Sequence, residues 1–172
     1  LRGTLDLAGR SQLDPKNLIL LPLAGEDCRL VSQGASTDLL SELKERAQGS
    51  RLIIIDPIRR FHDGDENDSS AMTRLVVVLE SLAKHTGAAV LALHHANRAS
   101  ASDGASQHAS RGSTALVDGA RWQLNLSVMD EKTAAAHGFT ETERLSHIAA
   151  DVAKFGRGGI QNLAAVREDA GN

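Results

Sequence analysis

The stretch Arg51-Leu-Ile-Ile-Ile-Asp56 places four apolar residues in a row directly before a carboxylate. A continuous apolar run of this length is typical of a strand that is buried on both faces, as in the middle of a parallel sheet. Ligands of such sheets bind beyond the carboxyl ends of the strands, where Asp56 would lie. The plainer alternative is that Asp56 only caps the turn or helix after its strand.

A second strand is predicted one helix later. An amphipathic helix begins after Ser69-Ser70 and ends at Gly87, and the aliphatic run Ala88–Leu93 that follows it ends on His94-His95. Strand, helix and strand of these lengths form a crossover unit with parallel strands. Asp56 and the two histidines should therefore lie side by side at one edge of the sheet.

Shorter patterns predict the rest of the fold. They are a strand at Leu18–Leu23, a helix at Thr37–Gln48, a short helix that ends at Asp118, a half-buried strand at Arg121–Val128, a short helix at Glu131–Ala136, and a hairpin of His147–Phe155 and Ile160–Val166. This order of strands and helices predicts a single α/β domain over residues 1–172, with an antiparallel hairpin at its C-terminal edge.

The composition restricts the classes of function. The net charge of −3 argues against a protein that holds nucleic acid by its overall field, so phosphates could be bound only by local clusters or by several copies that line a channel. The single Cys28 suits a reducing compartment. No apolar run approaches the roughly 18 residues of a membrane span, and no leader is recognisable, so a cytoplasmic protein without membrane contact is expected.

A nucleotide-hydrolysing site would be incomplete in this sequence. An aspartate at a strand end can hold a hydrated Mg²⁺, which accompanies a nucleoside triphosphate. The phosphate-binding string G-x-x-x-x-G-K-[ST] does not occur, and no glutamate ends an early strand. A metal-dependent hydrolase that uses His94, His95 and Asp56 is a further alternative, although the histidine spacing does not complete a zinc set.

Several basic residues border the predicted elements. Arg111 and Arg121 lie at element ends, and Arg121 adjoins Trp122, the only tryptophan. Lys154 and Arg157 flank the turn of the hairpin. For each of them the plain alternative is a solvated surface side chain, and the glycines of the hairpin could serve the turn alone.

Three segments of the chain carry a resemblance. They are Ile54-Ile-Asp-Pro-Ile-Arg-Arg-Phe-His62, Leu93-His-His-Ala96 and Ala109-Ser-Arg-Gly-Ser-Thr-Ala-Leu-Val-Asp-Gly-Ala-Arg-Trp-Gln123. In this order and at this spacing they resemble the RepA-type hexameric replicative helicases of plasmids, which have a RecA-like ATPase core. The resemblance covers residues from about 50 to about 157. It implies a RecA-like, mostly parallel sheet flanked by helices, with ATP and Mg²⁺ as cofactors, and a ring of identical subunits, expected to be a hexamer, around single-stranded DNA.

The resemblance also implies roles for single residues. Asp56 matches the Walker B aspartate that binds Mg²⁺ through water, and His95 matches the strand-end histidine that senses the γ-phosphate. Arg121 matches the arginine finger that completes the ATP site of the adjacent subunit. Lys154 and Arg157 match, more loosely, basic residues that lie near the same nucleotide-binding interface.

The segment 97–111 is expected to be a loop at the DNA. Its composition of Ala, Ser and Gly indicates a loop that is either mobile or ordered by a ligand. In the resembling family the matching loop faces the central channel, so Arg98 and Arg111 become candidate DNA contacts. The family's phosphate loop and catalytic glutamate lie upstream of the matched region, so an N-terminally incomplete chain that is inactive alone is expected. The alternative is a RecA-like module that assembles or binds DNA without hydrolysis.

Overall fold

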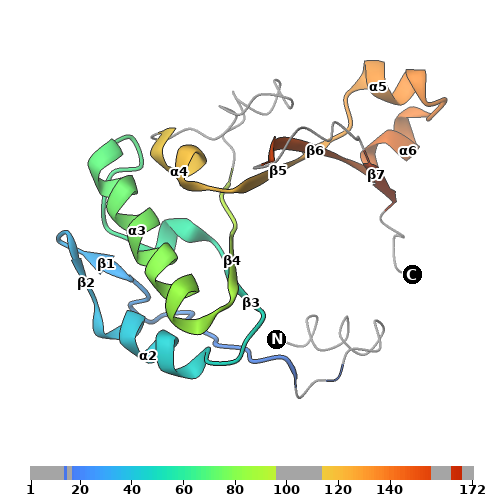
Figure 1. Cartoon of the computed structure of the whole chain (residues 1–172). Helices are drawn as coiled ribbons and strands as arrows, with labels where there is room; N and C mark the ends of the chain where they lie inside the picture. Colours follow the sequence, from blue (N-terminus) through green and yellow to red (C-terminus); the bar gives the residue numbers. More distant parts are fainter. Residues whose placement is uncertain (1–13, 15–16, 96–113, 156–163, 168–172) are drawn as a thin grey trace.

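The computed structural model describes residues 14, 17–95, 114–155 and 164–167 of the chain. Strands and helices are mixed along these residues, which confirms the α/β class (Figure 1). The elements are, in chain order, β1 (Val31–Ser32), β2 (Ala35–Ser36), α2 (Asp38–Arg46), β3 (Leu52–Ile55), the 3-10 helix η2 (Ile58–Phe61), α3 (Ser69–Thr86), β4 (Ala89–Ala92), α4 (Thr114–Gly119), β5 (Trp122–Val128), α5 (Glu131–Ala136), α6 (Glu141–Leu145), β6 (His147–Phe155) and β7 (Ala164–Arg167).

The predicted crossover unit is present. β3 and β4 pair in parallel, in a register that runs from Leu52 opposite Ala89 to Ile55 opposite Ala92. Helix α3 connects the two strands and packs against β4. The parallel pairing inferred from the apolar runs is therefore confirmed.

Helix α3 has sharp ends because both are capped. Asp68, rather than the expected Ser69 or Ser70, is the N-cap, and its carboxylate accepts a hydrogen bond from the Ser70 N–H at 2.8 Å. Gly87 ends the helix in the left-handed conformation, with φ 74°. The buried face consists of Ala71, Met72, Leu75, Val78, Leu82 and Thr86.

Helix α2 and a small hairpin complete this part of the fold. The predicted helix at Thr37–Gln48 is present as α2, with Thr37 as the residue before its first turn, and Leu40 and Leu43 of the helix are buried. The hairpin β1–β2 was not predicted. Its turn has positive φ angles at Gln33 (51°) and Gly34 (81°), which is the requirement of a two-residue type I′ turn.

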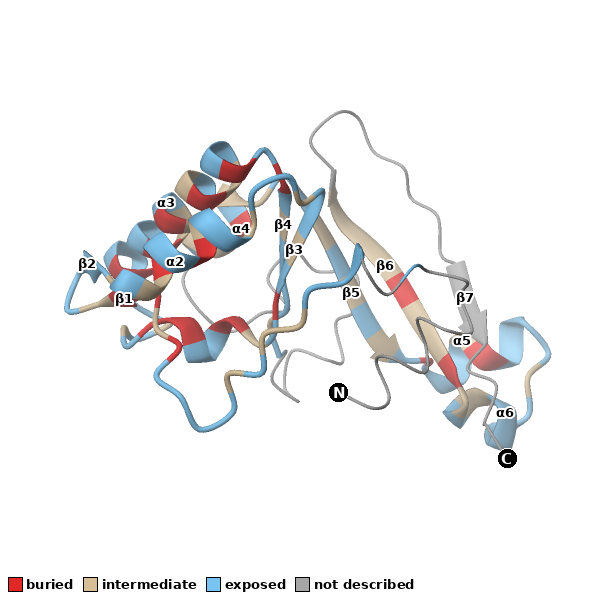
Figure 2. Cartoon of the chain, turned by 90° about the horizontal axis from the view of Figure 1, so that it is seen from below, coloured by how far each residue is buried: buried red, intermediate tan, exposed pale blue. Residues whose placement is uncertain are grey.

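One hydrophobic core lies between α2, α3, the hairpin and one face of β3–β4 (Figure 2). Its most buried side chains are Leu30, Met72, Leu75 and Leu82. The predicted strand at Leu18–Leu23 is wrong, since residues 18–23 have no strand structure. Leu21 and Leu23 instead pack against the core from an irregular segment, so their burial needs no ladder of hydrogen bonds.

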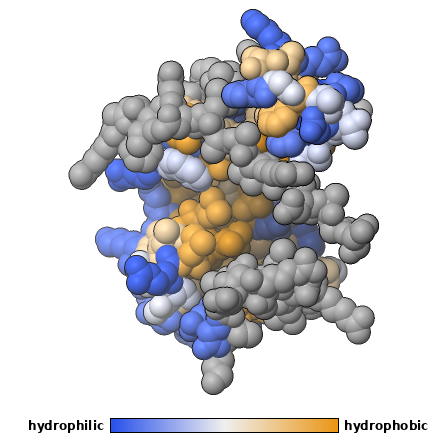
Figure 3. Space-filling view, turned by 90° about the vertical axis from the view of Figure 1, so that its right-hand side faces the viewer, coloured by the Kyte–Doolittle hydropathy of each residue, from blue (hydrophilic) through white to orange (hydrophobic). Residues whose placement is uncertain are grey.

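The prediction that the first strand is buried on both faces is also wrong for the described residues. Leu52 and Ile54 are 50% and 57% exposed, and the neighbouring Leu91 and Leu93 of the second strand segment are 37% and 39% exposed. The reason is that α2 and α3 cover only one face of the pair. Figure 3 shows the resulting apolar surface, which we call the open face of β3–β4.

A second sheet, β5–β6–β7, is antiparallel throughout. β5 alternates between exposed and half-buried residues, as predicted. The hairpin is confirmed: β6 pairs antiparallel with β7 (Ala164–Arg167), which contains residues 164–166 of the predicted second strand, and residues 160–163 lie outside the described residues. Helix α6, which was not predicted, begins with a capping box in which Thr140 and Glu143 satisfy each other's backbone N–H groups.

The described strands form three separate small sheets, β1–β2, β3–β4 and β5–β6–β7. One mostly parallel sheet was expected. The described residues show only one parallel pair of strands, β3–β4. The difference arises because β5 hydrogen-bonds with β6, and not with β4. None of the described helices is both long and apolar enough to span a bilayer.

Candidate functional site

The carboxyl ends of β3 and β4 are tied together beyond the last strand pair. The Leu93 N–H donates to the Ile55 carbonyl (2.9 Å), and the Ile58 N–H donates to the Leu93 carbonyl (2.8 Å). Asp56, between Ile55 and a cis-bonded Pro57, is exposed at this edge. The strand ends that carry Asp56 and the histidines therefore lie side by side, as the crossover unit required.

The two adjacent histidines have different surroundings. The His94 side chain is 20% exposed, and its Nε2 lies 3.5 Å from the Glu66 Oε2. His95 is exposed. This agrees with the expectation that neighbouring side chains at a strand end point to opposite faces. His95 is thus open to a ligand, whereas His94 is directed into the protein.

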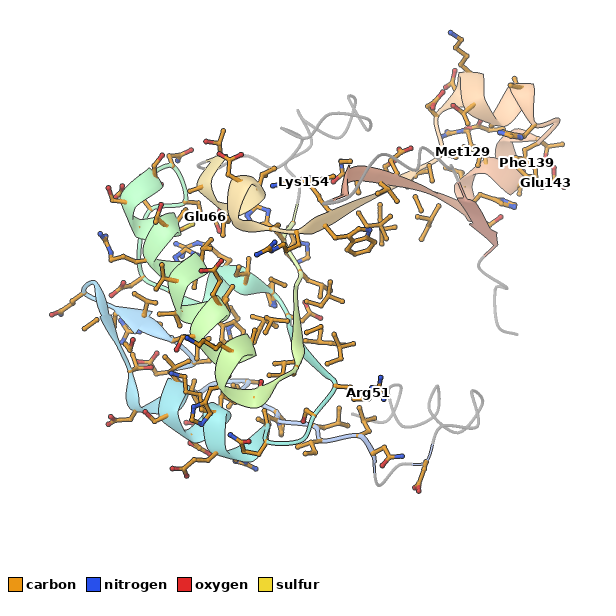
Figure 4. All side chains as sticks on the ribbon, viewed as in Figure 1. Arg51, Glu66, Met129, Phe139, Glu143 and Lys154 are labelled. Carbon is orange, nitrogen blue, oxygen red and sulfur yellow. The ribbon has the colours of Figure 1, made fainter. Side chains whose placement is uncertain are left out.

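Glu66 gathers three basic side chains, and Arg59, His62, Glu66 and His94 are called here the Glu66 cluster (Figure 4). The Glu66 Oε1 lies 3.8 Å from both the His62 Nε2 and the Arg59 Nε. Glu66 is not among the predicted site residues, because it lies in a polar stretch, residues 62–68, whose composition is typical of a solvated loop. The signal that could have revealed it is the apolar Phe61 immediately before His62, since Phe61 and His62 are both buried.

The surroundings of His62 disfavour its protonated form. Burial is the first cause that lowers the pKa of His62 below its usual 6.5, and the nearby Arg59 guanidinium acts in the same direction. Glu66 opposes them. The Gly64 backbone also acts to raise the pKa of His62, although neither ring nitrogen has a hydrogen bond of normal geometry among the described residues. Burial of such polar atoms carries a desolvation cost.

The described residues contain no group of three histidine, cysteine or acidic side chains placed to hold a metal ion. This contradicts the alternative in which His94, His95 and Asp56 form a transition-metal site. A hydrated Mg²⁺ needs less, since it keeps several waters and uses one or two carboxylates together with substrate phosphates. The exposed carboxylate of Asp56 at the strand edge fits that requirement.

Arg121 lies at the junction of α4 and β5, directly before the first residue of the strand, and is exposed. The Lys154 ammonium donates hydrogen bonds to the carbonyls of Val117 (2.7 Å) and Asp118 (2.9 Å), near the end of α4. Lys154 was predicted to bind nucleotide, and in this structure it contacts the protein itself. The roles of Arg121 and Lys154 stay predictions.

Three predicted site residues, Arg98, Arg111 and Arg157, lie outside the described residues, as does the whole of the predicted DNA loop, residues 97–111. The structure therefore brings together only one part of the predicted site, the strand ends with Asp56 and His95.

Comparison with protein families adds an independent finding. Residues 2–101 match a family described as AAA domain. The matched segment is more than half of the 172 residues and includes β3, α3 and β4 with Asp56, Glu66 and His95. Arg121 and Lys154 lie beyond it. Members of this family are ATPase-type domains of the RecA-like fold class, which generally bind ATP with Mg²⁺. The chain belongs to the AAA domain family.

Proposed function

We propose that the chain is the C-terminal portion of an ATP-dependent replicative DNA helicase core with a RecA-like fold. In this function, ATP hydrolysis at subunit interfaces drives movement along single-stranded DNA. The observation that carries the proposal is the parallel β3–β4 pair, which holds the ends bearing Asp56 and His95 at one edge of a chain that belongs to an ATPase-type family.

The roles follow from the chemistry of phosphoryl transfer. Such an enzyme chiefly positions its reactants and stabilises the negative charge that spreads over the phosphoryl oxygens. Asp56 would hold Mg²⁺ through water, and the exposed His95 would donate a hydrogen bond to the terminal phosphate. With ATP and Mg²⁺ bound, phosphoryl transfer to water would take place at this edge.

Arg121 would supply positive charge to the site of the neighbouring subunit. The supporting observation is that Arg121 is exposed and directly precedes β5, whereas Asp56 directly follows β3, which belongs to a different sheet. Because the arginine finger and the metal carboxylate would lie on adjacent subunits, ATP turnover would depend on assembly of the ring. In other nucleotide hydrolases a finger of this kind is worth about 10³–10⁵ in rate.

Contact with DNA is proposed for the loop 97–111, through Arg98 and Arg111. With a net charge of −3, a single chain does not have a generally basic surface. Several copies around a channel would bring such arginines together, which is how an acidic protein can still hold a phosphate backbone.

The proposal is tested by mixing subunits of the native protein. Asp56→Ala removes the metal carboxylate and Arg121→Ala removes the finger, so each variant alone should lose about 10³-fold or more in ATP turnover. A mixed ring contains interfaces with an intact Asp56 opposite an intact Arg121, and should regain part of the activity. If the two variants demonstrably co-assemble without any recovery, or if either variant alone keeps full turnover, the proposal is wrong.

A non-hydrolysing module that assembles or binds DNA is the second candidate. The observation in its favour is that the string G-x-x-x-x-G-K-[ST] does not occur in the 172 residues. Reading the gene upstream of the codon for Leu1 separates the two candidates. A phosphate-binding string in the same reading frame supports the helicase, and an open reading frame without one supports the module.

A further inference from the structure

Three sets of contacts hold the junction between α4 and β5. Helix α4 packs against α3, and the strand that follows it pairs with β6. Lys154 of β6 reaches back to the end of α4 (Figure 4). Arg121 lies between α4 and β5, so the direction of its side chain depends on the contacts that hold these two elements.

The contact of Lys154 is well suited to fix the end of the helix. The last carbonyls of a helix have no partner inside the helix, and a cationic donor near them is favourable. Lys154 donates to two of these carbonyls, Val117 O and Asp118 O, at 2.7 and 2.9 Å. Val117 is 9% exposed, so water competes little for the first of the two bonds.

Gly119 allows the same helix to pack closely against α3. A Cβ atom at this position would lie 2.6 Å from the Cγ1 and 3.0 Å from the Cγ2 of Val76 in α3. Only glycine allows the backbone of α4 to approach α3 so closely. The next residue, Ala120, donates its N–H to the Leu116 carbonyl at 3.1 Å, so the helical turn continues to the residue before Arg121.

The pairing of β5 with β6 is irregular at the same place. Gln123 lies opposite Lys154 and Leu124 lies opposite Val152, so Ala153 is an extra residue on β6. Such a bulge bends the strand that carries the extra residue, here β6 directly beside Lys154. Lys154 therefore pairs with β5 through its backbone and with α4 through its side chain.

We infer that Lys154 is a positioning residue that fixes the direction of Arg121 by joining the end of α4 to β6. The inference rests on the proposed function only for the role of Arg121, and its structural part stands on the contacts above. It differs from the expectation that Lys154 contacts nucleotide, because here the ammonium acts through Arg121.

The structural part is tested on this chain with Lys154→Met, which keeps the length of the side chain and removes the charge and the donors. The Ala120 amide should exchange its hydrogen about tenfold faster or more, because hydrogen bonds to a charged group are lost. The fluorescence anisotropy of Trp122, the only tryptophan, should fall. Lys154→Arg, which keeps a cationic donor, should restore both signals, and Lys132→Met, at an exposed lysine of α5, should change neither. Wild-type exchange at Ala120 in Lys154→Met would overturn the inference.

The functional part is tested by a double-mutant cycle on the ATP turnover of the native protein. If Lys154 acts through Arg121, Lys154→Met lowers kcat and leaves KM for ATP unchanged, and Lys154→Met with Arg121→Ala is no slower than Arg121→Ala alone. A further loss in the double variant means that Lys154 itself contacts the phosphates, which overturns the inference. Full activity of Arg121→Ala would instead refute the proposed finger, while the exchange experiment still decides whether Lys154 holds the junction.

Discussion

The β3–β4 region and the β5–β6–β7 sheet hold their candidate residues by different means. In the first region, Asp56 and His95 follow strands that are paired by backbone hydrogen bonds and supported by a core with fully buried side chains. In the second, Arg121 is held by a lysine, a glycine contact and a bulge. The first arrangement depends on burial, whereas the second depends on a few specific contacts. Substitutions should therefore affect the two regions in different ways.

The largest effect is expected in the core of the first region. Leu82 is fully buried, so Leu82→Ala should lower the free energy of unfolding by about 2–5 kcal/mol. Leu126 of β5 is 63% exposed, and Leu126→Ala should cost far less. Urea denaturation of the two variants measures the difference. Equal losses would show that the antiparallel sheet is buried by an interaction that the described residues do not contain.

A smaller effect is expected where the two regions meet. Gly119→Ala places a methyl group against Val76 and should cost about 1–3 kcal/mol, as overpacked sites do. Val76→Ala in the same chain removes the opposing methyl groups and should recover part of the loss. Thermal denaturation of the single and double variants checks this. If Val76→Ala gives no recovery, the close approach of α4 to α3 is not the cause.

Loss of a helix cap should have different consequences in the two regions. Asp68→Ala removes the N-cap of α3 and should cost about 1 kcal/mol of global stability, because α3 carries the core. Thr140→Ala removes the equivalent hydrogen bond in α6, which has no buried residue. We expect Thr140→Ala to increase amide exchange within α6 alone. A global loss in both variants would contradict the comparison.

The smallest effect is a dependence on pH that arises in the Glu66 cluster. The pKa of His62 in the folded chain lies below its usual 6.5, chiefly because of burial, so the unfolded chain binds a proton more readily. The contribution of neutral His62 is complete above pH 6.5 and is lost as the pH falls toward the lower pKa of the folded state. His62→Gln should flatten the stability profile in this range. Urea denaturation of the unchanged chain and of His62→Gln across this pH range measures the difference in slope.

Much of the first region could be predicted from the sequence. Arg51–Asp56 and Ala88–Leu93 are aliphatic runs of strand length, and the helix between them has a clear apolar face, so local pattern and final structure agree. Leu18–Leu23 is equally apolar but forms no strand, and Leu21 and Leu23 are partly buried against the core from an irregular segment. Burial of a short apolar run does not require strand structure.

The contacts of the candidate site were less predictable. Glu66 and His94 are 28 positions apart in the sequence, and Lys154 and Val117 are 37 apart, so only the folded chain brings these pairs together. The strand ends were predictable because parallel pairing follows from a short crossover. No local pattern indicates which lysine will contact a helix end. The apolar Phe61 indicates that the chain is buried near His62, but not that Glu66 lies beside two histidines.

The hydrogen bond from the Ile58 N–H to the Leu93 carbonyl has a mechanical consequence. It closes a loop of backbone that contains Asp56 and ends one residue before His94. The aspartate and the histidine pair are therefore connected through main-chain hydrogen bonds as well as through the chain itself. A change in what Asp56 binds would in this way reach the beginning of the segment that follows β4.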